Sequence, residues 1–260
     1  MIRAVLLAAL LLVARSAAAF DPFAGTGIDL RPGAQVPLDA VFHDQKGGDF
    51  RLREVAGNRP IVLVPVVHRC PNICGVTLGG LAQAIAAQKF VAGRDFDVVA
   101  LGIDPRETPV DAAQALDRLH HAFPGLAGVH GLVGSAGDVA AVTGALGYRY
   151  AWDEDAGQYA HIAAVAVLTS DGRLSRWIYG VAPDPNDLHL ALTEAGQGRI
   201  GSWADQLLLL CYRYDPQHGR YGSLIWAALR IAGAMTALGG AGLIARSLLR
   251  ERHASPSART

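Results

Sequence analysis

One stretch in the first third of the chain constrains its fold more than any other. Residues 61–67 form an apolar run rich in valine, and they are followed by Cys70-Pro-Asn-Ile-Cys74 and an Ala- and Leu-rich segment to Lys89. A short apolar β-branched run that gives way to helix formers is typical of a buried strand, a turn and a helix. The sequence therefore predicts both cysteines at the entrance of a helix, on one helix face and one turn apart.

Strand and helix signals alternate along the chain around this motif. The predicted elements are a hairpin over 41–52, a strand over 61–67, the cysteine helix, a strand over 96–103, a helix over 109–123, a strand over 128–133, a helix over 136–147, and two strands over 162–169 and 173–179. The last two strands flank Ser170-Asp171-Gly172, which predicts a β-hairpin. This order predicts an α/β fold, and a thioredoxin-like architecture with a β-hairpin insertion fits it best.

The N-terminus has the pattern of an export signal. A basic start and an apolar run are followed by small residues at Ala17 and Ala19. This pattern predicts a signal peptide over 1–19 and a mature chain that begins at Phe20. The alternative is an uncleaved membrane anchor, which the short apolar run disfavours.

The C-terminal part has the pattern of a membrane span. Residues 222–245 contain one charged residue, Arg230, and the segment 246–260 is basic. We expect one C-terminal transmembrane helix over 222–245, with a cytoplasmic tail by the positive-inside bias. The alternative is a membrane-surface helix, because the uninterrupted apolar run covers only 231–245. The predicted exported part is then a domain over 20–200 and a juxtamembrane segment over 201–221.

The charge of the exported part excludes one class of partner. Taking the seven arginines of the two terminal segments and Glu251 away from 23 basic and 23 acidic residues leaves 16 and 22, a net charge of −6. Nucleic acid is an unfavourable partner for such a domain, because its phosphates attract clusters of Lys and Arg.

The cysteines indicate a chemical site. The chain has three cysteines, an odd number that a framework of structural disulfides explains poorly, and two of them, Cys70 and Cys74, share one motif. Thiolates are soft ligands that favour Cu(I) or Zn(II), and an imidazole is the natural third ligand. The alternatives are a redox-active dithiol and a pair of buried or bridged structural cysteines.

Nine histidines compete for the third ligand position. His161 is the best candidate, because it opens the strand predicted over 162–169, where a thioredoxin-like sheet brings a strand start near the first helix. His68 is close to Cys70 in sequence, but an extended residue two positions away can simply line the same face.

Three motifs, in this order and at this spacing, resemble the Sco/SenC family. They are Cys70-Pro-Asn-Ile-Cys74 after a buried strand, Ile103-Asp-Pro-Arg-Glu-Thr-Pro109, and Tyr159-Ala-His161 before a hairpin with Asp171-Gly172. The family consists of membrane-tethered, thioredoxin-like copper proteins that help to assemble the binuclear copper centre of cytochrome c oxidase. The resemblance covers about residues 41–195.

The resemblance implies a site and a function. It implies that Cys70, Cys74 and His161 are copper ligands and that Asp104 stands close to them. It also implies a copper metallochaperone in the bacterial inner membrane, with its main domain in the periplasm. The implied acceptor is the copper-binding subunit of cytochrome c oxidase, and other periplasmic copper carriers or thiol reductases are further implied partners.

The chain also departs from the family pattern. Gly75 replaces a proline that is usual after the second cysteine, Glu107 replaces an aspartate, and Ala160 replaces an acidic residue before the histidine. These changes bear on copper affinity, redox tuning and partner choice, because groups around the ligands tune a metal. The predicted tether also follows the domain, whereas in the best-known members the tether precedes it.

Two other functions compete with copper delivery. A thiol-disulfide oxidoreductase would keep the cysteines of an acceptor reduced, with Cys70 as the attacking thiol. A tethered interaction or sensor module would use the cysteines only as a bridge, and its reduced form would bind no metal.

Overall fold

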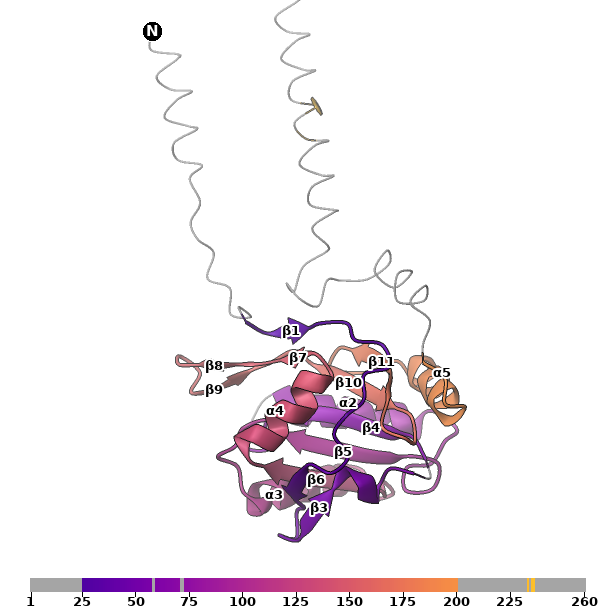
Figure 1. Cartoon of the computed structure of the whole chain (residues 1–260), viewed down its shortest axis with the longest axis horizontal. Coiled ribbons are helices and arrows are strands. Elements are labelled where there is room, and N and C mark those ends of the chain that lie inside the picture. The colour runs from indigo at the N-terminus through magenta and orange to yellow at the C-terminus, as the bar shows by residue number, and fades with distance from the viewer. Residues whose placement is uncertain (1–24, 58, 71–72, 201–232, 234, 237–260) are drawn as a thin grey trace, which may run out of the picture. The chain divides into compact units, whose positions relative to one another are not determined.

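The computed structural model describes residues 25–57, 59–70, 73–200, 233, 235 and 236, with the side chains of Ile73 and Cys74 outside that description (Figure 1). The chain divides into two units, 1–200 and 201–260, and the strands and helices named below belong to the first.

A seven-stranded sheet forms the centre of the first unit, in the strand order β11-β10-β4-β5-β6-β2-β3. Strands β4, β5 and β6 are parallel to one another, and the remaining neighbours in the sheet are antiparallel. The strands are β2 (Val41–His43), β3 (Asp49–Arg51), β4 (Ile61–Val66), β5 (Asp97–Gly102), β6 (Val129–Gly134), β10 (Ala164–Leu168) and β11 (Leu174–Tyr179). The predicted α/β class is therefore confirmed, as are the hairpins β2–β3 and β10–β11.

Helices cover both faces of this sheet. They are α2 (Ile73–Ala86), α3 (Pro109–Ala122), α4 (Ala136–Ala145) and α5 (Pro185–Gly196), with a short 3-10 helix, η1 (Leu52–Glu54), after β3. In Figure 1, α4 lies in front of the sheet, whereas α2 and α3 lie behind it. Helix α2 contacts both α3 and α5. Since both faces are covered, every residue of β4, β5 and β10 is buried, which explains why these strands are apolar without alternation, apart from Asp97 at the start of β5.

The helix starts follow from local capping. Thr108 precedes α3 and forms a capping box with Asp111, whose Oδ2 accepts the Thr108 backbone N–H at 2.8 Å. Ser135 precedes α4, and its hydroxyl oxygen accepts the backbone N–H of Asp138 at 3.1 Å. Both helices begin at the residues where the sequence predicts them, 109 and 136.

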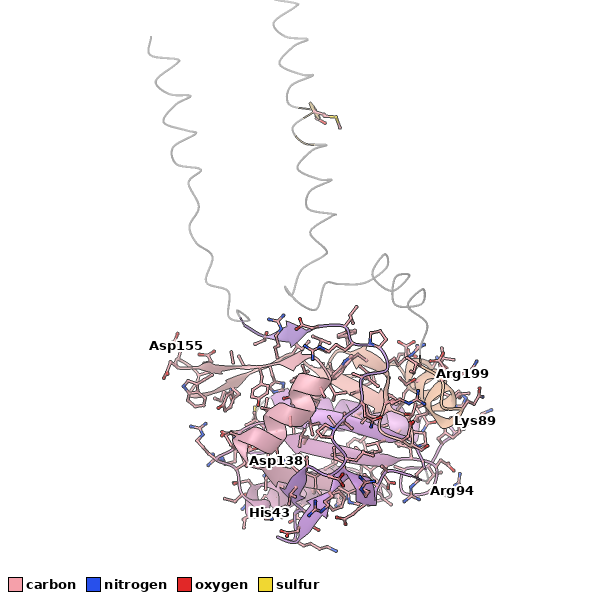
Figure 2. The ribbon with its side chains drawn as sticks, viewed as in Figure 1. His43, Lys89, Arg94, Asp138, Asp155 and Arg199 are labelled. Atoms are coloured by element: carbon pink, nitrogen blue, oxygen red, sulfur yellow. The ribbon has the colours of Figure 1, made fainter. Side chains whose placement is uncertain are left out.

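Two small antiparallel pairs lie outside the main sheet, and the sequence predicts neither. Strand β1 (Gly27–Ile28) pairs with β7 (Tyr148–Arg149), and β8 (Ala151–Asp153) pairs with β9 (Gln158–Ala160). Each strand has two or three residues, too few for a periodic pattern. The β8–β9 hairpin projects beyond the sheet, and Figure 2 shows Asp155 at its tip.

No helix among the described residues is long and apolar enough to span a membrane. The predicted signal peptide (1–19), juxtamembrane segment (201–221), transmembrane helix (222–245) and cytoplasmic tail (246–260) lie outside the described residues, apart from Gly233, Met235 and Thr236.

Candidate metal centre

The candidate site lies at the carboxyl ends of the central parallel strands. Strand β4 ends at Val66 and leads to Cys70, and the neighbouring strand β5 ends at Gly102 and leads to Asp104. In α/β sheets, ligands bind in the crevice outside these strand ends. An open pocket of about 300 Å³ occupies this position, and its lining residues are Val67, Arg69, Cys70, Asp104, Arg106, Ala156, Gly157 and Gln158.

Cys70 is partly buried and lies in a turn before α2. Its backbone N–H donates to the Val67 carbonyl at 3.1 Å, and α2 begins only at Ile73. Cys74 is the second residue of that helix. The prediction that both cysteines share one helix face is therefore wrong, because Cys70 lies outside the helix.

Asp104 is buried and is held by arginine. Its carboxylate accepts hydrogen bonds from Arg106 Nε at 2.8 Å and Arg106 Nη2 at 2.6 Å, while Arg69 Nη2 lies 3.8 Å from its Oδ2. The Arg106 hydrogen bonds hold the pKa of Asp104 below its usual value, against the effect of burial. Asp104 thus stays ionised, and it lines the same pocket as Cys70.

Arg106 also connects the pocket to the β8–β9 hairpin. Its guanidinium carbon lies 4.2 Å from the centre of the Trp152 ring, a cation–π contact. Trp152 in turn packs edge to face against Tyr159 in β9, with ring centres 5.3 Å apart. The turn between β8 and β9 lines the same pocket as Cys70, through Ala156 and Gly157.

His161 follows directly after β9, the strand whose first residue, Gln158, lines the pocket. Its Nδ1 lies 3.0 Å from the Tyr148 hydroxyl oxygen and 3.3 Å from the Ile162 carbonyl oxygen. Burial lowers the pKa of His161, so the imidazole is neutral at pH 7 and suited to hold a metal.

A complete ligand set is not assembled within the described side chains. Among them, no group of three or more His, Cys, Asp or Glu residues stands ready to hold a metal ion. The side chain of Cys74 lies outside that description, so the set of Cys70, Cys74 and His161 stays a prediction. The donor types agree with copper, because two thiolates and a neutral imidazole are soft and borderline ligands.

A comparison with known protein families shows which family the chain belongs to. Residues 33–194 match the model of the SCO1/SenC family, which is more than half of the chain. The chain belongs to the SCO1/SenC family. No curated protein matches the chain.

Solved structures show the same fold as this SCO1/SenC domain. A protein of Aquifex aeolicus VF5 matches at 24% identity with a TM-score of 0.57, over 65% of this chain and 96% of the other. Arabidopsis thaliana ScoI with copper bound matches at 20% identity with a TM-score of 0.52, over 64% and 99%. A SCO1/SenC family lipoprotein of Bacillus anthracis matches at 16% identity with a TM-score of 0.51, over 64% and 97%.

Two buried titratable residues lie next to pocket residues in the sequence or contact one of them, and the sequence did not predict either as functional. His68 is 3% exposed, and its Nε2 lies 3.1 Å from the Leu132 carbonyl oxygen. Glu107 is 7% exposed, and its Oε1 accepts the backbone N–H of Arg69 at 2.8 Å. Burial lowers the pKa of His68 to about 4 and raises the pKa of Glu107 to about 7.

Gly102 separates these two side chains. A Cβ at this position would lie 2.9 Å from Glu107 Oε2 and 3.0 Å from His68 Cδ2. Both side chains therefore pack against Gly102, the last residue of β5. The sequence shows Glu107 only as a departure from the family pattern, and no periodic signal indicates that it is buried.

Proposed function

We propose that this SCO1/SenC protein is a membrane-anchored copper metallochaperone. It binds copper through the thiolates of Cys70 and Cys74 and the imidazole of His161, and it delivers the ion to the binuclear copper site of cytochrome c oxidase. The observation that carries the proposal is the pocket that Cys70 and Asp104 line together with the hairpin strand that leads to His161. Family membership and a copper-bound structure with the same fold support it.

The surroundings of Cys70 suit a thiolate ligand. Two guanidinium groups, those of Arg69 and Arg106, line the pocket with it, and positive charge nearby favours the thiolate over the thiol. Asp104 balances part of this charge, because Arg106 donates two short hydrogen bonds to it. The pocket therefore places two arginines with Cys70 without collecting a large excess of positive charge.

The open pocket would allow copper to pass directly to an acceptor protein. Cys70 is only partly buried and the pocket is open to solvent, so a thiolate or imidazole of the acceptor can approach the bound ion. Incoming donors would replace the three ligands one at a time, and the ion would never be released into water. The placement of the domain in the periplasm, with a C-terminal tether in the inner membrane, belongs to the same proposal.

Competitive copper titration tests the ligand set. We expect the reduced protein to bind one Cu(I) against a chromophoric chelator, and the double variant Cys70→Ser/Cys74→Ser to lose binding. His161→Ala should weaken binding by at least about tenfold, because one of three ligands is lost. The matched control is His121→Ala on the exposed surface of α3, which should bind as the wild type does.

Two outcomes would contradict the proposal. If the double cysteine variant keeps full copper affinity, then the thiolates are not ligands. If the reduced wild-type protein binds no copper, then the tethered interaction module, whose cysteines only form a bridge, becomes the better interpretation.

A second function, thiol-disulfide exchange, is favoured by the position of Cys70 in an open, arginine-lined pocket. The Cys70 thiolate would attack a disulfide sulfur of the acceptor, form a mixed disulfide and displace one acceptor thiolate. Cys74 would then attack Cys70, release the second acceptor thiolate and leave the protein oxidised, to be restored by a thiol reductase. His161→Ala separates the two functions, because it should weaken copper binding but leave the exchange rate unchanged.

A further inference from the structure

Tyr148 is a buried residue that contacts His161 and that no motif of the sequence singles out. Its side chain is 2% exposed, and its ring stacks on Trp177 of β11 with ring centres 5.6 Å apart. Its hydroxyl oxygen lies 2.7 Å from the Ile162 carbonyl oxygen and 3.0 Å from His161 Nδ1. The hydroxyl is therefore placed between a backbone acceptor and one nitrogen of the imidazole.

The number of hydrogens decides the direction of these two bonds. A tyrosine hydroxyl has one hydrogen to donate, and a carbonyl oxygen can only accept. The 2.7 Å contact is the shorter one, so the hydroxyl donates to Ile162. The 3.0 Å contact with His161 is then a hydrogen bond only if Nδ1 carries a hydrogen and donates it to the hydroxyl oxygen.

A second contact agrees with this assignment. The Ile162 carbonyl oxygen also lies 3.3 Å from His161 Nδ1, and it is again an acceptor. With the hydrogen on Nε2 instead, Nδ1 and the carbonyl oxygen would both be acceptors and would compete for the single hydroxyl hydrogen. Only the Nδ1–H form satisfies all three atoms.

We propose that Tyr148 is a positioning residue that selects the Nδ1–H tautomer of His161 and so directs the lone pair of Nε2 to a metal. A histidine binds a metal through the nitrogen without hydrogen, and the hydrogen bond of the other nitrogen determines which one that is. The imidazole is thus oriented before any ion arrives. The role as a metal ligand rests on the proposed function, whereas the tautomer does not.

The stacking of Tyr148 explains how the hydroxyl is held in place. Its strand, β7, pairs with β1, and its ring packs against Trp177, which is itself buried in β11. A hydroxyl on such a ring has little freedom to leave His161. The selection is therefore a property of the folded domain and does not need the metal.

The experiment is long-range ¹H–¹⁵N NMR of the histidine side chains in the reduced, metal-free protein at about pH 8, where the imidazole is neutral. His161 is assigned from the resonances that His161→Ala removes. We expect the wild type to show a hydrogen on Nδ1 and none on Nε2. In Tyr148→Phe the ring and its stacking stay, but the hydroxyl is lost, so we expect a mixture of the two tautomers.

A matched control and a binding measurement complete the test. Tyr150→Phe removes a neighbouring hydroxyl that interacts with Thr143, and it should leave the His161 spectrum unchanged. Cu(I) affinity should fall about tenfold in Tyr148→Phe and stay constant in Tyr150→Phe, as is usual when the partner of a ligating histidine is removed.

Two results would overturn the proposal: a wild-type spectrum with the hydrogen on Nε2, or a Tyr148→Phe spectrum identical to that of the wild type. The first needs only the wild type and His161→Ala for the assignment, so the proposal can fail even if Tyr148→Phe does not fold. If the wild type shows the Nδ1–H form but binds no copper, the tautomer assignment holds and the proposed function fails.

Discussion

Replacement of the buried Glu107 by glutamine should stabilise the protein at neutral and alkaline pH. The carboxyl group has a pKa of about 7 in the folded protein, against an ordinary value of 4.5, because burial disfavours its charged form. In the unfolded chain the group loses its proton near that ordinary value. Between these two values the folded state holds a proton that the unfolded state has released, so the free energy of unfolding falls as the pH rises.

The size of the effect follows from the shift. One pKa unit corresponds to about 1.4 kcal/mol, so a rise from 4.5 to about 7 makes the ionised form less stable in the folded protein by about 3 kcal/mol. Below about pH 4.5 the group is protonated in both states and the penalty is absent. Glutamine has no charge at any pH, and its amide oxygen can still accept the Arg69 backbone N–H that Glu107 accepts at 2.8 Å.

The assay is urea unfolding of the reduced, metal-free wild type and Glu107→Gln at several values between about pH 4.5 and pH 8. The pH profile of the wild type alone does not isolate Glu107, because His68 also changes the free energy of unfolding with pH. Burial lowers the pKa of His68 to about 4, so its effect makes the protein more stable as the pH rises. The stability that the neutral, buried His68 contributes is fully present above its ordinary pKa of 6.5 and is lost as the pH falls through about 4. The difference between the two proteins removes His68 and isolates Glu107.

We expect this difference to be near zero at about pH 4.5 and to grow to about 3 kcal/mol in favour of Glu107→Gln at pH 8. The exposed Glu154→Gln on the β8–β9 hairpin is the control, and it should stay within about 0.5 kcal/mol of the wild type throughout. The reasoning that burial raises the pKa of Glu107 would be refuted if the difference in the free energy of unfolding did not change with pH. It would also be refuted if the variant were less stable than the wild type at pH 8.

Two further substitutions, at Arg106 and Gly102, test the packing around Asp104 and the end of β5. Arg106→Gln should lower the free energy of unfolding by about 2 kcal/mol, because the 3% exposed carboxylate of Asp104 loses both guanidinium hydrogen bonds and keeps only the backbone N–H of residue 106 at 3.0 Å and the 3.8 Å contact with Arg69. The control Arg53→Gln breaks an exposed pair and should cost less than about 1 kcal/mol in the same urea assay. Gly102→Ala should cost about 1–3 kcal/mol, since its Cβ would lie 2.9 Å from a buried carboxylate oxygen. Gly144→Ala, with nothing within 4 Å of the new Cβ, should instead stabilise α4 by about 0.5 kcal/mol in thermal unfolding, and equal effects at the two glycines would contradict this explanation.

Most of the main fold could be predicted from the sequence, because its signals are local. The apolar run of β4 and the caps Thr108 and Ser135 lie within a few residues of the elements they define. The strand at 96–103 is observed as β5 with one residue fewer at each end, and the predicted hairpin at 162–179 is observed as β10–β11. Where the local signal was short, as in β8 and β9, the prediction failed.

The neighbours of the candidate ligands could not be predicted in this way. Glu107 accepts a hydrogen bond from a residue 38 positions away, and His68 contacts a carbonyl 64 positions away. Their burial depends on how β4, β5 and β6 align, and no short sequence window contains that information. The same holds for Arg106 and Trp152, which meet only because the β8–β9 hairpin turns back over the loop after β5.

By itself, the sequence determined the order of the main-sheet strands and of α2, α3 and α4, as well as the motif with Cys70 and Cys74, and it singled out His161 as the best candidate for a third ligand. These features depend on residue type and spacing along the chain. Only the tertiary structure decided that Cys70 lies before α2, that Asp104 is buried under Arg106, and that Tyr148 contacts the Nδ1 of His161. Each of these depends on burial and on the direction of a side chain, which the chain acquires only when distant segments pack together.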